Sequence, residues 1–374
     1  MRVIKPLYGI AEVGTHWWAT YHSHHIKKLQ MVTSSYGPCL LISSSENAEF
    51  AMVGMQTDDT IGLTTLAFSQ REDEKLAEAA FKAKPKEALE EGKPLIFNGG
   101  IVSLEGEILT LRQKGQGKRL EVAATKQHPN EACFDLSSAA QHQDPTEGDT
   151  KALNKRIRWQ MENQERGLHF LPLDLSAARI FVFVDGSFAN NRDLTSQLGF
   201  AIILANEEMR SDEGTFKIRS NLIHFSSTKS KRVTRSVLAS EVYGMVAGVD
   251  MAYAISSTLK MVTDHLNLPL IPTVVCTDSY SLYECLVKLG TTKQKRLMID
   301  IMALRQSYER RELQEVRWIH GDDNLADAFT KGDPALYTHG CLVRVNKTFQ
   351  SLVRVALGEG VCQVIVSVDP ANLL

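Results

Sequence analysis

The sequence has few cysteines and no long apolar run, and each of these absences excludes a class of protein. The six cysteines are scattered without a C-x-x-C pair, which argues against a cysteine-based zinc cage and against the disulfide framework of a secreted protein. No run approaches the ~20 apolar residues that cross a bilayer. Residues 1–10, MRVIKPLYGI, lack the apolar core of a signal peptide. We therefore expect a cytoplasmic or nuclear protein that is not secreted and has no membrane partner.

An excess of charge of either sign is also lacking. The 42 Lys and Arg residues nearly balance the 44 Asp and Glu residues, so the chain as a whole carries no basic signal for nucleic acid. A local basic face is compatible with that balance. The length of 374 residues, with 43% hydrophobic and 23% charged residues, is typical of a folded protein of two or three domains.

The order of expected elements predicts an α/β fold in the second half of the chain. Strand character occurs at residues 179–185, 197–205, 216–226, 271–277 and 314–319. Helical character occurs at residues 232–256, 279–289, 294–311 and 323–331. Because strands come first and then alternate with helices, we expect a mixed sheet with helices packed against it.

The first half has a different pattern, with hairpins and two helical segments. Residues 50–68 indicate two strands joined at Thr57–Thr60, and another strand pair is expected around Gly99-Gly100 and Glu105-Gly106. Residues 71–93 have the dense alternating charge of an exposed helix, interrupted by Pro85. Residues 151–168 are helical in composition, and residues 134–141 could begin a helix. The apolar residues 361–368 indicate either a strand or an exposed sticky tail.

The stretch IFVFVDGS, residues 180–187, places an acid directly after an apolar run. A continuous β-branched and aromatic run is typical of a strand buried on both faces, so Asp185 would lie where the sheet meets solvent. Asp-Gly is also a strong turn dipeptide, so a simple turn is the alternative. Other carboxylates must decide between the two.

Three further acids stand in comparable places. Asp278 follows the run TVVCT just as Asp185 follows its own strand, and two parallel neighbouring strands would present both acids at one sheet edge. Glu241 lies in the long helix and Asp327 follows the strand EVRWI. The helix around Glu241 has an apolar face at helical spacing, formed by Val237, Leu238, Val242, Met245 and Val249.

Converging carboxylates predict a metal site. They would repel one another unless divalent cations neutralised them, and two Mg²⁺ ions ~3.5–4 Å apart can activate water and stabilise a leaving oxygen at a phosphodiester. Taken singly, each acid has an ordinary explanation as a turn former or an exposed helix residue. Taken together, their placement favours a metal-dependent nuclease or phosphotransfer site.

These motifs resemble a known family. The order VDGS, Ser-Glu in a helix, TDSYS and WIHGDDNLADAFTK is similar to the ribonuclease H domain of copia-type retrotransposon polyproteins. Upstream, LYGI with Trp17-Trp18 resembles the segment after the reverse transcriptase fingers, and QTDDT resembles the paired-aspartate motif. FNGGIVSLEGEILTLRQKGQGKRL and FDLSSAAQ resemble the thumb and connection. The resemblance extends over nearly the whole chain, to about residue 335.

The resemblance implies a domain order and a fold. Residues 1–70 would be a truncated reverse transcriptase palm and residues 71–172 a thumb or connection. Residues 173–335 would be a ribonuclease H-like domain, with a five-stranded mixed sheet flanked by helices, and residues 336–374 a tail of unknown role. The family's polymerase needs a first catalytic aspartate upstream of LYGI, which this chain lacks. Asp58 and Asp59 would therefore be a vestigial pair, and DNA synthesis by this chain is not expected.

The resemblance also implies an activity and a set of site residues. Asp185, Glu241, Asp278 and Asp327 match the metal-binding and catalytic carboxylates, which would hold two Mg²⁺ ions, with Mn²⁺ as a substitute. The RNA strand of an RNA–DNA hybrid would be hydrolysed, and other retroelement fragments are candidate partners. His320 occupies the place of a histidine that assists proton transfer. The expected nucleic-acid contacts are Ser187, Arg235, Lys295, Arg296, Asn324 and Lys331.

Three alternatives remain open at this stage. A catalytically silent remnant that binds nucleic acid would keep the fold without turnover. A three-prime exonuclease on the same fold favours Asp-x-Glu on the first strand, whereas Gly186-Ser187 follows Asp185 here. The cluster HWWATYHSHH, residues 16–25, suggests zinc, but without cysteine we expect solvated histidines on an ordinary helix.

Overall fold

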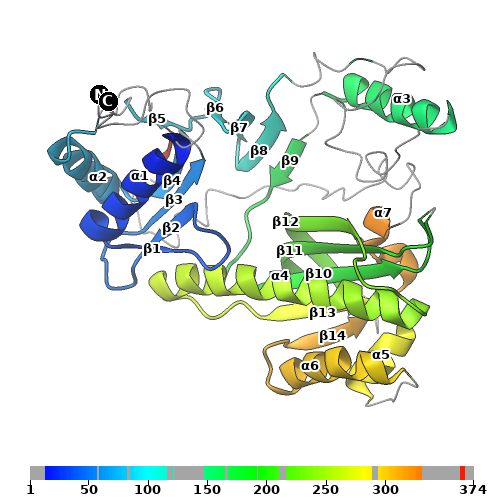
Figure 1. Cartoon of the computed structure of the whole chain (residues 1–374). Coiled ribbons are helices and arrows are strands. Elements are labelled where there is room, and N and C mark those ends of the chain that lie inside the picture. Colours follow the sequence, from blue (N-terminus) through cyan, green and yellow to red (C-terminus); the bar gives the residue numbers. More distant parts are fainter. Residues whose placement is uncertain are drawn as a thin grey trace, which may run out of the picture.

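The computed structural model describes residues 13–56, 59–81, 85–115, 121, 147–164, 167–191, 193–209, 216–288, 294–330 and 363–366. Within these ranges the chain forms three β-sheets with α-helices packed against them (Figure 1). None of the helices in this part of the chain combines the length and the apolar character that a membrane span requires.

The central sheet of the second half is mixed and five-stranded. Strand β10 pairs antiparallel with β11 and parallel with β13, and β13 pairs parallel with β14. This is the mixed sheet flanked by helices that the sequence predicts. Its strands, in spatial order, are β12 (Phe216–Lys229), β11 (Gln197–Met209), β10 (Ala178–Ser187), β13 (Thr273–Thr277) and β14 (Glu315–Trp318).

Helices cover both faces of this sheet because β10 is apolar on both sides. Ile180 and Val182 pack with α4 (Val237–His265), α5 (Tyr280–Val287) and α6 (Met298–Glu309). Phe181 and Phe183 point to the opposite face and pack with Ala326, directly before α7 (Asp327–Thr330). Strand β10, the middle strand of this sheet, therefore packs against helices on both faces (Figure 1).

Helix α4 differs from its predicted bounds at both ends. It begins five residues later than expected because the Ser236 side chain caps it by accepting a hydrogen bond from the Ala239 amide at 3.1 Å. It extends to His265 rather than to residue 256. The added turns pack against the first half of the chain, where Val262 contacts Ile42 and Phe50. This partner is remote in sequence, so the local pattern could not indicate it.

The first half contains a six-stranded sheet covered by two helices. The predicted β3–β4 hairpin is confirmed, and Asp59 begins β4 by pairing with Gln56. Helices α1 (Val13–Leu29) and α2 (Leu66–Glu78) pack on this sheet through a common core. In spatial order the strands are β1 (Met31–Thr33), β2 (Leu40–Ser43), β3 (Ala51–Gln56), β4 (Asp59–Thr64), β15 (Gln363–Val366) and β5 (Glu87–Ala88).

Strand β15 comes from the other end of the chain. It pairs antiparallel with β4 and with β5, so Ile365 lies opposite Gly62 on one side and Ala88 on the other. Of the two alternatives for the apolar segment 361–368, the strand is confirmed for the four residues that the structure describes.

A third sheet connects these two parts. It consists of β6 (Leu95–Phe97), β7 (Gly100–Glu105), β8 (Ile108–Gln113) and β9 (Gly167–Phe170), all antiparallel. The predicted strand pair is confirmed by β7 and β8, and Gly99 and Gly106 adopt positive φ values of 72° and 61° at the turns that precede and follow β7. Helix α3 (Glu147–Glu162) confirms the predicted helical segment 151–168 only as far as Glu162, because Gly167 and Leu168 belong to strand β9. Residues 134–141 lie outside the described residues.

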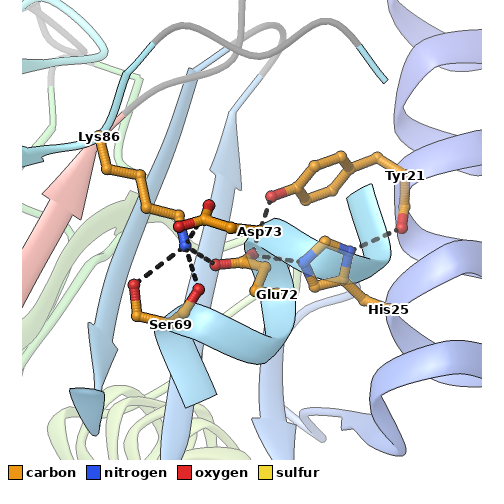
Figure 2. Close-up of polar contacts among 6 residues, drawn as sticks. All are labelled: Tyr21, His25, Ser69, Glu72, Asp73 and Lys86. Atoms are coloured by element: carbon orange, nitrogen blue, oxygen red, sulfur yellow. Dashed lines mark hydrogen bonds and ion pairs between the residues drawn. The ribbon is translucent and has the colours of Figure 1, made fainter. Parts of the chain in front are cut away.

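Residues 71–93 are predicted as an exposed helix followed by a connector, and the predicted exposure is wrong for one face of α2. Glu72 is buried, and its Oε1 lies 2.7 Å from His25 Nε2 and 3.2 Å from the Tyr21 hydroxyl. Its Oε2 lies 2.9 Å from Lys86 Nζ, which also forms an ion pair with Asp73 (Figure 2). These partners from α1 and from beyond α2 neutralise the acid, which allows a charged helix to bury it.

The same network corrects the expectation for the histidine cluster. His25 is completely buried, and its Nδ1 lies 3.0 Å from the carbonyl oxygen of Tyr21 (Figure 2). Both ring nitrogens therefore have hydrogen-bond partners within the protein, so His25 is not a solvated histidine. His16 is exposed, as expected of a solvated histidine, whereas His22 and His24 are half-buried.

Candidate metal-binding site

Asp185 lies in a strand, so the turn alternative for Asp-Gly is wrong. Strand β10 continues through Gly186 to Ser187 and pairs with β11 throughout. Gly186 is needed for close approach to α4, because a Cβ at this position would lie 2.3 Å from the carbonyl carbon and oxygen of Ser240. Gly244, one turn further along α4, would place a Cβ 2.8 Å from the Asp185 carbonyl oxygen. Two glycines thus bring the backbone of Asp185 against the helix that carries Glu241.

Asp278 lies beside Asp185 for the reason that the sequence suggests. The parallel pairing of β10 with β13 ends at Val184 and Thr277, and each acid is the next residue along its strand. Glu241 projects from the beginning of α4. Carboxylate oxygens of Asp185, Glu241 and Asp278 all lie within 4.8 Å of one another. The structure therefore brings together three of the four predicted acids.

Asp327, the fourth acid, lies at the beginning of α7 and is half-buried. It is not part of the group within 4.8 Å. Its negative charge nevertheless contributes to raising the pKa of Glu241, which places it near the cluster.

The cluster is electrostatically unfavourable without a cation. Burial, followed by the charges of Asp185 and Asp278, raises the pKa of Glu241 to about 9, against the lowering effect of a hydrogen bond from the Gly186 amide. Glu241 Oε2 and Asp278 Oδ1 are buried oxygens with no hydrogen-bond partner among the described residues. Buried oxygens without donors are costly, and an all-carboxylate set suits Mg²⁺, Mn²⁺ or Ca²⁺. The residues present thus fit a divalent cation.

Three further predicted site residues lie in different surroundings. His320 is exposed at the rim, and its neighbour Gly321 approaches Asp278, because a Cβ there would lie 3.4 Å from Asp278 Oδ2. Ser187 is half-buried at the end of β10. Asn324 is buried, and its side-chain Nδ2 donates to the Val184 carbonyl at 3.0 Å, so it faces the protein interior.

The basic residues lie near the beginning of α4. Arg235 is exposed directly before the cap residue Ser236, and Gln294 Nε2 donates to the Ser236 hydroxyl at 2.5 Å. This bond attaches the 3-10 helix Lys295–Leu297 to the same place, with Lys295 and Arg296 exposed. The helix that carries Glu241 thus begins beside a local basic surface.

Two predicted residues lie outside the described residues, namely Lys331 and Asp58. Asp59 is half-buried in β4, in a different sheet from the carboxylate cluster, and its Oδ2 accepts a hydrogen bond from the Asn98 amide at 3.4 Å.

Sequence reasoning missed Thr330 and Trp318. The Thr330 hydroxyl donates to Asp185 Oδ2, and Trp318 Nε1 donates to the Asp278 carbonyl at 3.0 Å. Thr330 follows Asp327 by three residues, a spacing that places both on one side of a helical turn. That spacing was the available signal for Thr330, whereas nothing in the sequence indicated the contact of Trp318.

No protein-family model matches the chain, and no curated protein does. Among solved structures, the chain is similar to the N-terminal RNase H domain of a Mycobacterium tuberculosis protein, with 17% identity, 41% of this chain and 91% of that chain covered, and a TM-score of 0.28. LC11-RNase H1 was isolated from compost by a metagenomic approach. Its structure in complex with an RNA/DNA hybrid shows 17% identity, covers 41% of this chain and 94% of that chain, and has a TM-score of 0.28.

A foamy viral protease-reverse transcriptase in complex with dsDNA shows 15% identity, with 42% of this chain and 95% of that chain covered, and a TM-score of 0.25. Similarity at these levels assigns neither an activity nor a substrate to this chain. Both must be argued from the residues of the site.

Proposed function

We propose that the chain is a ribonuclease H that hydrolyses the RNA strand of RNA–DNA hybrids with two divalent metal ions. The observation that carries this proposal is the convergence of Asp185, Glu241 and Asp278 within 4.8 Å, where Glu241 Oε2 and Asp278 Oδ1 are buried without a hydrogen-bond partner among the described residues. The quoted motifs, from VDGS to NLADAFTK, support an origin in a copia-type retroelement polyprotein. The division of the chain at about residue 173 into a polymerase remnant and a nuclease domain is part of the same proposal.

The four acids would hold the metal ions, which supply Lewis-acid stabilisation and an activated water when bound. Asp185 and Asp278 approach the site from adjacent strand ends, Glu241 from the helix above them and Asp327 from α7. The rigid sheet edge and the close packing of β10 against α4 fix three of these carboxylates before any ligand arrives. His320, exposed on the rim, is placed to exchange protons with solvent.

The substrate would approach over the basic surface at the beginning of α4. Arg235, Lys295 and Arg296 are exposed there and are available for phosphate oxygens. Double-helical nucleic acid with an RNA strand is recognised through its shape and its 2′-hydroxyls rather than through base sequence. A few exposed cations beside the site therefore suffice, and the net charge of −2 is compatible with this partner.

The test is a cleavage assay with four labelled substrates: an RNA–DNA hybrid, single-stranded RNA, double-stranded RNA and double-stranded DNA. The expected result in Mg²⁺ or Mn²⁺ is cutting of the hybrid's RNA strand alone, leaving 3′-hydroxyl and 5′-phosphate ends. Asp185→Asn should abolish cutting, whereas Asp264→Asn, an acid-to-amide change at an exposed residue near the far end of α4, should not. Binding of the hybrid without cutting would contradict the proposed ribonuclease H activity and would favour a catalytically silent protein that binds nucleic acid.

A further inference from the structure

Two hydrogen-bonding side chains attach α7 to the strand that carries Asp185. Asn324, three residues before the start of α7, is 5% exposed, and its Nδ2 donates to the carbonyl of Val184 at 3.0 Å. Its Oδ1 accepts from the Ala326 amide at 3.1 Å, so both ends of the side-chain amide are engaged. The bond falls on the residue immediately before Asp185, at the point where the pairing of β10 with β13 ends.

Thr330, the last residue of α7, forms the second attachment. It is 3% exposed, and its hydroxyl donates to Asp185 Oδ2. The carbonyl of Asp327 lies 3.3 Å from the same hydroxyl as a second possible acceptor. The carbonyl of Thr330 accepts a hydrogen bond of 2.7 Å from Asn190 Nδ2. The hydroxyl of Thr330 therefore contacts the candidate metal ligand, and its carbonyl contacts the loop that follows β10.

The methyl group of Thr330 has a separate, apolar contact. A Cβ on Gly199 of β11 would lie 2.7 Å from Thr330 Cγ2, so Gly199 leaves the space that this methyl group fills. The hydroxyl and the methyl group thus contact different strands. Substitutions that remove the hydroxyl and keep the methyl group, or the reverse, can separate the effect of the hydrogen bond from the effect of the packing.

We propose that Thr330 and Asn324 are positioning residues for the metal site. Thr330 fixes the orientation of the Asp185 carboxylate, so that one oxygen is held by the hydroxyl and the other is directed to the cation. Together the two side chains hold α7, and with it Asp327, against the end of β10. This inference rests on the proposed metal site and reassigns Asn324 from a nucleic-acid contact to an internal role.

The test compares two pairs of variants that differ only in the hydroxyl. Wild type and Thr330→Val share the methyl contact with Gly199, and Thr330→Ser and Thr330→Ala both lack it. Binding of Mn²⁺ is measured by titration calorimetry, alongside thermal unfolding in metal-free buffer and the kcat and KM of hybrid cleavage. Thr263→Val is the matched control, because Thr263 is buried at the far end of α4 and its hydroxyl donates to the Lys260 carbonyl.

Removing the hydroxyl in either pair should weaken Mn²⁺ binding by about 10-fold to 100-fold and lower kcat with little change in KM, as for other residues that orient a metal ligand. Thr330→Ser should bind Mn²⁺ nearly as wild type does. Equal Mn²⁺ affinity within both pairs, or within the pair that folds, would overturn the inference. A wild-type chain that binds Mn²⁺ but cuts no hybrid would contradict the proposed function alone, and one that binds no Mn²⁺ would contradict both.

Discussion

At the scale of single residues, the molecule buries carboxylates in two ways. The carboxylate of Glu72 forms hydrogen bonds with His25 and Tyr21 and an ion pair with Lys86 (Figure 2). Glu241 is surrounded by other acids, and one of its oxygens has no hydrogen-bond partner among the described residues. The first arrangement is complete within the protein, whereas the second becomes favourable only with a cation.

The metal-free protein should therefore become more stable when Glu241 is changed to Gln, because the substitution removes a buried group that the neighbouring acids repel. Saturating Mg²⁺ should stabilise the wild type, by about 2.7 kcal/mol at 100 times the dissociation constant. Thermal unfolding with and without Mg²⁺ measures both effects. If Glu241→Gln lowers the melting temperature in metal-free buffer, or responds to Mg²⁺ as the wild type does, the cluster does not hold a cation.

The Glu72 network, in contrast to the Glu241 cluster, should stabilise the protein without a metal ion. Burial tends to raise the pKa of Glu72, but the hydrogen bond and charge of His25 and the charge of Lys86 outweigh it and lower the pKa to about 2. A lowered carboxyl pKa contributes stability that is complete above the ordinary value of 4.5 and is lost as the pH falls toward 2. Denaturant unfolding between pH 6 and pH 2 should show this loss, and Glu72→Gln should reduce it. An unchanged pH profile in the variant would refute the assignment.

Removing one partner of this network should be costly. Lys86→Met leaves Glu72 buried with less compensation and should destabilise the protein by about 3–5 kcal/mol. The control is Lys260→Met, which breaks the exposed pair with Asp264 on α4 and should cost less than about 1 kcal/mol. Urea unfolding measures the free energy of unfolding of both variants. Equal losses would show that the network of Figure 2 stabilises the protein no more than an exposed ion pair does.

At the scale of elements, the site depends on how closely β10 approaches α4. Gly186 and Gly244 allow this approach, since a side chain at Gly186 would collide with the backbone of Ser240 rather than with a movable side chain. The Ser236 cap then determines where α4 begins and therefore which helical turn carries Glu241.

Gly186→Ala should separate the strand from the helix and cost about 1–3 kcal/mol or more, as overpacking does in well-packed cores. It should also weaken metal binding, because Asp185 and Glu241 would move apart. Gly37→Ala is the control, since a Cβ at Gly37 meets nothing within 4 Å. Chemical denaturation and Mn²⁺ titration of both variants measure the two effects. A fully stable Gly186→Ala variant that binds metal normally would contradict this account.

Much of the site could be predicted from the sequence, and the exceptions have a common cause. Asp185 and Asp278 were predictable because an acid after a buried strand is a local pattern, and Glu241 because its helix has an apolar face. The burial of Glu72, the extra turns of α4 and the hydrogen bond of the Thr330 hydroxyl were not predictable, although the spacing of Thr330 from Asp327 indicated that both lie on one side of a helical turn. Each depends on a partner remote in sequence, namely His25 and Lys86, Ile42 and Phe50, and Asp185.

At the scale of the whole molecule, segments remote in sequence hold the two halves together. The far end of α4 packs on the first sheet through Val262 and Phe50, and His265 Nδ1 lies 3.1 Å from the Ser44 carbonyl. Strand β15 joins β4 to β5, so residues near the end of the chain complete a sheet formed near its beginning (Figure 1).

Ile365→Pro should therefore loosen the first sheet without affecting the carboxylate cluster. Proline removes a backbone donor and is poorly tolerated between two paired strands. Amide hydrogen exchange of residues 61–64 and 87–88 should become faster, while hybrid cleavage and Mn²⁺ binding should stay unchanged. Ile365→Thr keeps the donor and serves as the control. Unchanged exchange in the proline variant would show that β15 does not complete the sheet in solution.

The metal-dependent carboxylate site is best tested by the rate of RNA-strand cleavage in an RNA–DNA hybrid. The wild-type chain and Glu241→Gln are compared in Mg²⁺ and in EDTA. The wild type should cut in Mg²⁺ only, and the Glu241→Gln variant, although folded and at least as stable in metal-free buffer, should not cut. Equal cutting by both proteins, or cutting in EDTA, would contradict a metal-dependent carboxylate site.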